Sequence, residues 1–164
     1  MKLLSIGLLI FCMINSCAQT VTTQGYIKGK KFEGHIFSKE YAPLTMRFKE
    51  AKKRYTPTEQ DISKAEKIIK DQVVNINQPL VNQGGNCPII HSNLSKYKRQ
   101  YIGYVDERGD KIVWVNFIIR KDKEKISRLS KDVIIVLDGC SNYWNIKVNL
   151  NKEKLFELRI NGSA

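Results

Sequence analysis

The spacing of apolar residues changes once along this 164-residue chain, from a helical repeat to the alternation of β-strands, and this change limits the folds it can adopt. The helical part opens on Thr56-Pro57-Thr58-Glu59, which predicts Thr56 as N-cap, proline at the first helical position and a capping box closed by Glu59. Apolar residues then recur at three- and four-residue steps, at Ile62, Ala65, Ile69, Val73 and Ile76. Asn77-Gln78-Pro79 ends the repeat, so we expect one amphipathic helix over about residues 57–76.

From residue 98 onward the apolar residues follow the two-residue period of strands. Five strands are predicted, at residues 99–105, 111–119, 133–138, 143–150 and 156–161. The first pair flanks the turn 106–110 and the second pair flanks 139–142, so each pair is expected to form a hairpin. The sequence therefore predicts an α+β fold in which one amphipathic helix packs on an antiparallel meander sheet of four to six strands.

Two of these strands, 111–119 and 133–138, carry apolar residues on both faces. Strands of that kind lie in the interior of a sheet whose two faces are both covered. One helix covers one face only. The second cover is expected from the N-terminal segment 26–48, which itself holds strand-like stretches at 26–27 and 32–37; a partner chain or a ligand are the alternatives.

The first residues have the pattern of an export signal. Lys2 precedes an apolar run from Leu3 to Ile14, and this run is shorter than the roughly 20 residues of a membrane-spanning helix. Ile14-Asn15-Ser16-Cys17 resembles a bacterial lipobox, in which Cys17 becomes a lipidated N-terminus. Cleavage after Ala18 by ordinary signal peptidase is the alternative.

These features divide the chain into a signal peptide at 1–16, a polar tether at 17–25 and a single α+β domain at 26–164. The expected location is the cell envelope, in the outer membrane or periplasm, with the N-terminal lipid as membrane anchor. After processing, Cys87 and Cys140 are the cysteines that remain. An even pair in an oxidising compartment predicts a disulfide, against the alternative of two unpaired, partly buried thiols.

The order of one helix followed by a long antiparallel meander is similar to the cystatin-like and NTF2-like α+β arrangements. This is a likeness of fold and carries no activity with it. In addition, residues 55–59, 98–105 and 144–150 with Asn161-Gly162 resemble a set of small secreted or lipid-anchored bacterial envelope proteins of unknown function. That resemblance covers about residues 50–164. It implies export and one domain, and it brings no catalytic residues.

Catalytic and metal-binding patterns are sparse in this sequence. The two histidines are His35 and His91, so a nucleophilic pair would join Cys87 or Cys140 to His91, with Asn142 orienting the base. A zinc site would require both cysteines and both histidines to converge. The sequence contains no phosphate-binding glycine loop, GxSxG elbow or HExxH motif. We therefore expect no enzyme activity, no metal and no cofactor.

The chain is strongly basic, with a formal charge of +12. The charge is concentrated at 28–31, 49–54, 96–99 and 120–131. Because an exported protein does not meet genomic DNA, we expect no nucleic-acid partner, and the partners considered are lipid A phosphates, anionic phospholipid, or an acidic protein or glycan. Lysine outnumbers arginine 21 to 7, so a lysine-rich solvated surface is the alternative reading.

These observations favour a noncatalytic binding module that presents a basic, aromatic sheet surface to an anionic or protein partner. The residues predicted to form this surface are Tyr101, Trp114, Tyr143, Lys98 and Arg99.

Two other classes of function remain alternatives. One is a small NTF2-like enzyme with a pocket in the sheet concavity and His91 or Asp138 at its mouth. The other is a protease inhibitor or immunity protein that binds through the loops around Gly84-Gly85 and Gly139-Cys140.

Overall fold

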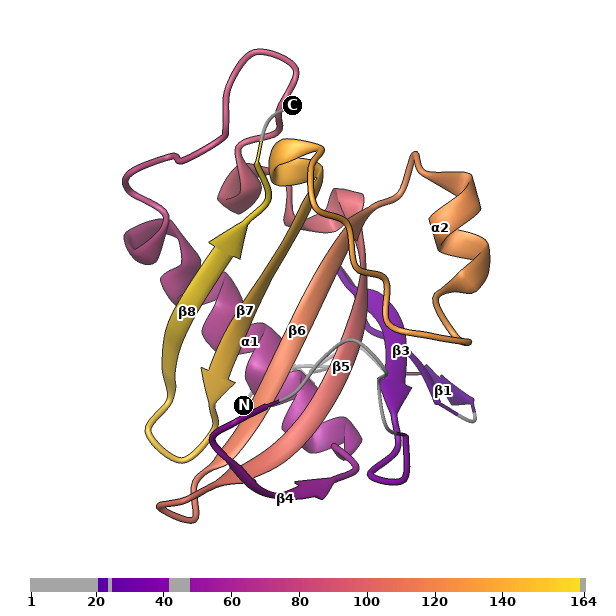
Figure 1. Ribbon diagram of the computed structural model, residues 1–164, viewed down its shortest axis with the longest axis vertical. Helices are drawn as coiled ribbons and strands as arrows, with labels where there is room; N and C mark the ends of the chain where they lie inside the picture. The colour runs from indigo at the N-terminus through magenta and orange to yellow at the C-terminus, as the bar shows by residue number, and fades with distance from the viewer. Residues whose placement is uncertain (1–20, 24, 42–47, 163–164) are drawn as a thin grey trace, which may run out of the picture.

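The computed structural model describes residues 21–23, 25–41 and 48–162 of the chain. These residues form a sheet that is backed by one long helix (Figure 1). The strands are β1 (Val21–Thr23), β2 (Tyr26–Lys28), β3 (Glu33–Phe37), β4 (Ala51–Tyr55), β5 (Tyr97–Asp106), β6 (Lys111–Ile119), β7 (Tyr143–Asn149) and β8 (Lys154–Ile160). The helices are α1 (Glu59–Ile76) and the short α2 (Lys123–Arg128), with 3₁₀ turns η1 (Ile90–Ser92), η2 (Leu94–Lys96) and η3 (Cys140–Asn142). The predicted α+β class is confirmed, and these segments form more strands than the four to six expected.

The sheet order is β1-β2-β3-β5-β6-β7-β8, and all neighbours are antiparallel except β3 and β5. Strand β4 also pairs with β5. Strands β3 and β4 share one edge of β5, because β3 pairs with residues 99–102 and β4 with residues 103–106. The predicted N-terminal strands thus become β2 and β3, whereas β4 was not predicted.

The predicted hairpin of residues 99–105 and 111–119 is confirmed as β5 and β6. Its turn has a local cause: the Asp106 carboxylate accepts hydrogen bonds from the backbone N–H groups of Arg108 and Asp110, at 3.0 and 2.8 Å. Gly109 has φ +88°, a left-handed conformation that glycine adopts without steric cost. The last predicted strand is confirmed as β8.

Helix α1 starts two residues later than predicted. Its N-cap is Thr58, not Thr56, because Thr58 and Asp61 form a reciprocal capping box through two hydrogen bonds of 3.1 Å. The Thr56 hydroxyl instead accepts a hydrogen bond from the backbone N–H of Lys39. The helix ends at the predicted place, with Asn77 as its C-cap.

The main core lies between α1 and one face of β5–β8. Ile62, Ile69 and Val73 of α1 are at most 1% exposed, and they belong to the same cluster as Phe117 and Trp144. The rings of Phe117 and Trp144 stack with centroids 3.6 Å apart. Figure 1 shows α1 behind the sheet and the segment that follows α2 in front of it.

Residues 133–138 do not form the predicted interior strand, and the second predicted hairpin is wrong. Strand β6 pairs with β7 from Ile112 to Ile118, so no place remains beside it for another strand. Residues 120–142 instead form a long connection between β6 and β7, which we call the crossover. It passes over the face of the sheet that lies opposite α1. Its apolar residues have unequal roles: Val133 and Ile134 are buried, while Leu137 is 90% exposed.

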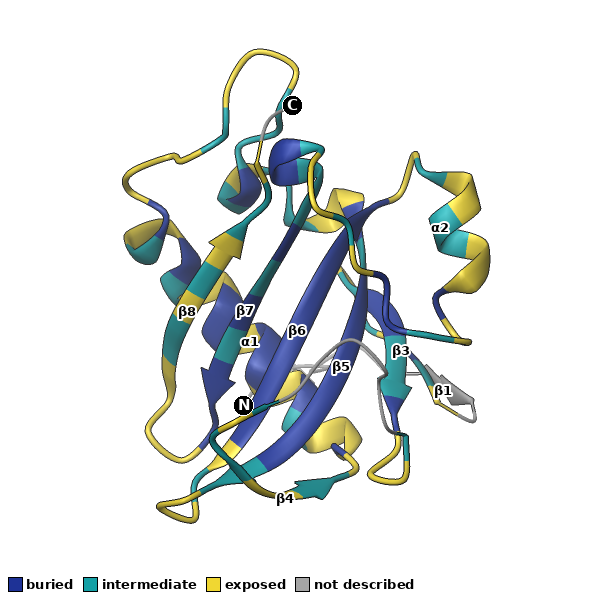
Figure 2. Ribbon diagram, viewed as in Figure 1, coloured by how far each residue is buried: buried dark blue, intermediate teal, exposed yellow. Residues whose placement is uncertain are grey.

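The second cover of the sheet therefore comes from two segments. The N-terminal segment, the expected cover, supplies Phe37, Tyr41 and Phe48 against Ile102 and Trp114. The crossover supplies the rest, with Val133 packed in the same cluster and Leu129, Ile134 and Ile126 packed around Ile118. Residues 112–119 are consequently buried on both faces, as predicted for this strand (Figure 2).

Buried amides hold the crossover on the sheet. Gln100 donates to the backbone carbonyls of Leu129 and Asp132 at 2.9 and 2.8 Å, and its carbonyl oxygen accepts from the N–H of Ile134 at 2.9 Å. Asn116 donates to the carbonyl of Ile134 at 2.8 Å. These side chains satisfy backbone groups that an irregular segment would otherwise bury without partners.

The predicted signal peptide and Cys17 lie outside the described residues. Strand β1 falls within the predicted tether, so the sheet begins before the expected boundary at residue 26. In the described part of the chain, no helix has both the length and the apolar character needed to cross a bilayer.

Ile69→Asp should destabilise the fold by more than about 4 kcal/mol, because it places an unpaired carboxylate in the core under α1. Val74→Asp is the matched control on the same helix, since Val74 is 40% exposed, and we expect a loss of about 1 kcal/mol or less. Urea unfolding followed by circular dichroism measures both. Similar losses for the two variants would contradict the described packing of α1.

Candidate functional site

A basic groove of about 700 Å³ lies along one side of α1, and it is larger than two other hollows of about 440 and 360 Å³. Three segments far apart in the sequence form its walls: α1, the loop between β2 and β3, and the 3₁₀ turns before β5. We call it the α1 groove. It is lined by Lys30, Lys31, Phe32, Ser63, Glu66, Lys67, Lys70, His91, Ser92, Leu94, Ser95 and Arg99.

The wall from α1 follows from helical spacing. Ser63, Glu66, Lys67 and Lys70 stand at positions i, i+3, i+4 and i+7, so they form one stripe beside the apolar stripe. Lys67 forms an ion pair with Asp71 at 2.8 Å, but the Lys67 side chain is 78% exposed, so this pair contributes little to the stability of the fold. Lys70 is exposed.

The other two walls add positive charge and apolar surface. The loop between β2 and β3 closes with a hydrogen bond from the Gly29 N–H to the Phe32 carbonyl at 2.9 Å, and this tight loop carries Lys30, Lys31 and Phe32. The 3₁₀ turns contribute Leu94 with three polar residues. The groove thus combines lysines with an apolar portion formed by Phe32 and Leu94.

A buried ion pair lies at the base of the groove. Arg99 Nε is 2.9 Å from Glu66 Oε1, and the Tyr101 hydroxyl donates to the same oxygen at 2.8 Å. Arg99 also donates to the Tyr97 carbonyl at 2.7 Å, and its guanidinium lies 5.0 Å from the centroid of the Phe117 ring. Burial, together with the adjacent Glu66, raises the pKa of Tyr101 well above its usual value. Removal of either ionic partner typically costs about 3 to 5 kcal/mol.

With Arg99 and Glu66 neutralising each other, the groove keeps the charge of four lysines. These are Lys30, Lys31, Lys67 and Lys70, of which Lys67 shares its charge with Asp71. An excess of one sign along a partly enclosed groove raises the local concentration of counter-ions. The arrangement is chemically suited to hold an anion.

Glu33 collects further cations beside the groove. Lys98 forms an ion pair with it at 2.5 Å, Arg120 forms a second, and the Tyr26 hydroxyl donates to it at 2.6 Å. Burial alone would raise the pKa of Glu33, but the hydrogen bonds from Lys98, Tyr26 and Arg120 outweigh burial and lower this pKa to about 2. Burial and the bond to Glu33 raise the pKa of Tyr26 to about 12.

The structure does not bring the five predicted surface residues together on one open face. Tyr101 and Arg99 are buried under α1, whereas Trp114 is buried on the opposite face, where its indole N–H donates to Asn145 at 3.1 Å. Tyr143 is half-buried on that opposite face and hydrogen-bonds to Asp122 of the crossover. Of the five, only Arg99 lines the α1 groove.

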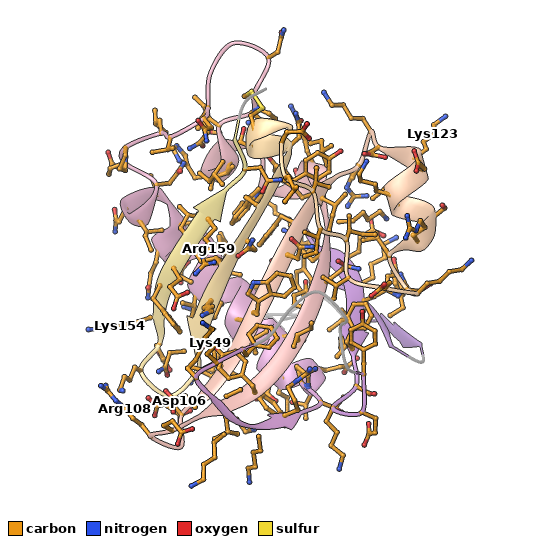
Figure 3. The ribbon with its side chains drawn as sticks, in the orientation of Figure 1. Lys49, Asp106, Arg108, Lys123, Lys154 and Arg159 are labelled. Carbon is orange, nitrogen blue, oxygen red and sulfur yellow. A yellow bond between two sulfur atoms is a disulfide. The ribbon has the colours of Figure 1, made fainter. Side chains whose placement is uncertain are left out.

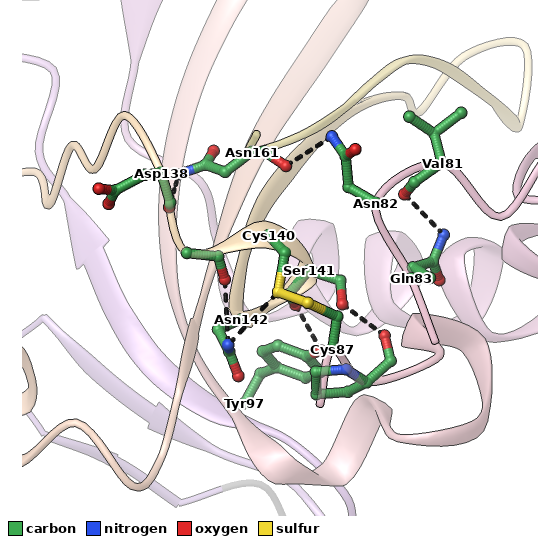
Figure 4. The surroundings of a disulfide bond; sticks show 12 residues. Val81, Asn82, Gln83, Cys87, Tyr97, Asp138, Cys140, Ser141, Asn142 and Asn161 are labelled. Carbon is green, nitrogen blue, oxygen red and sulfur yellow. Dashed lines mark hydrogen bonds between the residues drawn. A yellow bond between two sulfur atoms is a disulfide. The ribbon is translucent and has the colours of Figure 1, made fainter. Parts of the chain in front are cut away.

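The predicted disulfide between Cys87 and Cys140 is confirmed, with Cα atoms 6.0 Å apart (Figure 4). It joins the loop after α1 to η3, so the two glycine-containing loops lie side by side. Ser141 strengthens the junction, since its hydroxyl donates to the Pro88 carbonyl at 2.6 Å. Because both sulfurs are bonded to each other, the Cys-His pair and the zinc site considered above lose their thiolates.

The remaining chemical candidates lie apart from one another. His91 lines the α1 groove, and its Nδ1 is 3.0 Å from Asn77 Nδ2. Asp138 lines a separate hollow beside the disulfide, of about 360 Å³. His35 lies on β3, where burial and the charge of Lys98 lower its pKa. Among the described residues, no three His, Cys, Asp or Glu side chains are grouped as metal ligands.

Sequence reasoning missed most of the α1 groove. Lys67 and Lys70 fall outside the apolar stripe of the predicted helix, and nothing else about them marks a site. The positive charge at residues 28–31 is visible in the sequence, but the wall that it faces is not. The helical stripe was a usable signal for one wall, but nothing local in the sequence indicates that the β2–β3 loop lies opposite it.

Comparisons with models of protein families, with curated proteins and with solved structures give no match.

Because folding lowers the pKa of Glu33 from 4.5 to about 2, ionised Glu33 should contribute stability above pH 4.5 that is lost as the pH falls toward 2. The contribution at neutral pH is on the order of 3 kcal/mol. Urea unfolding at pH 7 and pH 3 should show a smaller loss between the two pH values for Glu33→Gln than for the unmodified chain. Glu107→Gln, at an exposed turn, is the control and should behave as the unmodified chain.

Proposed function

We propose that this protein is a noncatalytic, exported binding module that holds an anionic ligand in the α1 groove. The observation that supports this proposal most directly is the set of four lysines around a groove whose arginine and glutamate already neutralise each other. A groove built only to complete the fold would not need this excess of positive charge, which opposes folding through mutual repulsion.

The shape and lining of the groove favour a particular class of anion. A volume of about 700 Å³ falls in the range of small-molecule sites. Phe32 and Leu94 offer apolar contact, while the lysines act as separate point charges and do not form a bidentate fork. We infer that the ligand carries several spread negative charges next to an apolar or ring-shaped part, as a phosphorylated or sulfated sugar does.

The proposed location fits such a ligand. An envelope protein anchored through Cys17 would lie among phosphorylated lipid headgroups and anionic glycans, and a basic surface is attracted to both. The exported chain would bind this ligand without catalysing a reaction, as a receptor or a carrier.

Replacing one lysine on each of two walls, Lys30→Glu with Lys70→Glu, should weaken anion binding by at least about tenfold, equivalent to about 1.4 kcal/mol. The measurement is calorimetric titration of the purified chain, in mild detergent and at low salt, with pyrophosphate and with a heparin-derived hexasaccharide. The first probe represents a phosphorylated headgroup and the second an anionic glycan.

The matched control is Lys123→Glu with Lys154→Glu, which changes the net charge equally at exposed sites on α2 and at the start of β8 (Figure 3). It should lower affinity only slightly and should leave the number of sites unchanged. An equal loss in both double variants would assign binding to general charge and would reject the groove. If the unmodified chain binds neither probe, the proposed function is wrong.

We also propose that Cys17 is lipidated, on the basis of the Ile14-Asn15-Ser16-Cys17 sequence. Cys17→Ser should move the protein from the membrane to the soluble fraction, because the acyl chains supply about 0.8 kcal/mol per buried CH₂ group. Cell fractionation and intact-mass spectrometry check this. Unchanged fractionation, together with a mass that lacks acyl chains in the unmodified protein, would show the proposal to be wrong.

A further inference from the structure

Two segments at the end of the molecule that carries the disulfide are nearly uncharged, in contrast to the rest of the chain. Residues 77–90 contain no Asp, Glu, Lys or Arg, and residues 133–146 contain only Asp138. We call the exposed surface formed by these two segments and the adjoining end of β8 the neutral rim. Depletion of charge is typical of the centre of protein–protein interfaces.

The neutral rim carries both a projecting apolar side chain and an apolar hollow. Leu137 is 90% exposed, the largest exposed fraction of the large apolar residues described. The hollow has a volume of about 440 Å³ and is lined by Ile76, Asn77, Pro79, Leu80, Val81, Leu158, Arg159 and Ile160. Val81 and Leu80 at its border are 54% and 40% exposed.

Asn161 fixes the projection and the hollow relative to each other. The side-chain amide of Asn161 donates to the backbone carbonyls of Val136 and Asp138, which flank Leu137. The backbone carbonyl of Asn161 accepts a hydrogen bond from the Asn82 side chain at 2.8 Å. Figure 4 shows Asn161 between Asp138 and Asn82. The disulfide holds the same two segments together, so little conformational freedom would be lost on association.

We propose that the neutral rim is the interface of a symmetric homodimer, in which Leu137 of each copy enters the apolar hollow of the other. A two-fold interface requires that each patch contain both members of every contact, and the rim contains the projection and the hollow together. The same placement brings Asp138, next to Leu137, toward Arg159 at the border of the hollow in the second copy. This charge pair also occurs twice.

The low charge of these segments favours the approach of a second copy at this face. A chain with a formal charge of +12 repels its own copies over most of its surface, and the low charge of the two segments of the neutral rim reduces this repulsion where two copies meet. Arg159 is available for a new contact, because its side chain is 72% exposed and its ion pair with Glu157 is a surface pair of 3.2 Å.

The test is the molar mass of the purified chain, in mild detergent, measured by light scattering and sedimentation across a range of protein concentrations. The unmodified chain should pass from monomer to dimer as concentration rises. Leu137→Asp should raise the dimer Kd by about 30-fold or more, the size expected for a central contact. Because Leu137 is exposed, this substitution should leave the circular dichroism spectrum and the thermal unfolding of the chain unchanged.

A charge exchange tests the proposed geometry independently. Asp138→Arg alone should weaken the dimer by about tenfold or more, since it would face Arg159, and adding Arg159→Asp should restore most of the affinity. Arg108→Asp is the control for the second change, because Arg108 lies in the β5–β6 turn at the far end of the sheet (Figure 3). Combined with Asp138→Arg, it should restore nothing.

Three results would overturn the proposal. They are a monomer at every concentration, a dimer unaffected by Leu137→Asp, or a charge exchange that restores no affinity. None of these bears on the α1 groove, so the dimer and the proposed anion binding succeed or fail separately.

Discussion

The burial of β6 on both faces is the constraint on which the rest of this structure depends. Residues 112–119 are buried without interruption, so the sheet needs a cover on each side. Leaving such side chains in water would forgo roughly 1.5 to 3 kcal/mol for each large one. Helix α1 covers one face with a regular apolar stripe. The other face is covered by Phe37, Tyr41 and Phe48 of the N-terminal segment and by the crossover, because the chain has no second long helix among its described residues to place there.

Each cover is held by polar groups that the sheet itself provides. Under α1, the Glu66 carboxylate accepts from Arg99 and Tyr101, which fixes the rotation of the helix over β5. On the opposite face, the amides of Gln100 and Asn116 bond the backbone of the crossover. Arg99 and Gln100 are consecutive residues whose side chains point to opposite faces, as in any strand. One short stretch of β5 therefore secures both layers, and its arginine also forms the base of the α1 groove.

Local patterns were sufficient for the elements whose cause is local. The helix, the hairpin turn at Asp106 and the disulfide partners followed from apolar spacing, turn chemistry and the prediction of export. Residues 133–138 were not predictable in this way, because Val133 and Ile134 read the same whether they belong to a strand or to a segment lying across a sheet. The N-cap was misplaced since both Thr56 and Thr58 satisfy the pattern, and Thr56 bonds to Lys39 instead. The groove depends on three distant segments meeting, which no local pattern encodes.

The shared edge of β5 has a consequence for how the chain reaches its final state. Strands β3 and β4 precede β5 by a long stretch of sequence, and both pair with it, whereas β5, β6, β7 and β8 follow one another in the sheet. Contacts distant in sequence carry a larger closure entropy and tend to form late. Along the proposed export route β3 and β4 leave the cytoplasm before β5, the strand that supplies their shared partner edge. Strands β1, β2 and β3 can pair with one another as they emerge, but the edge of β3 that faces β5 stays open until residues 97–106 have crossed.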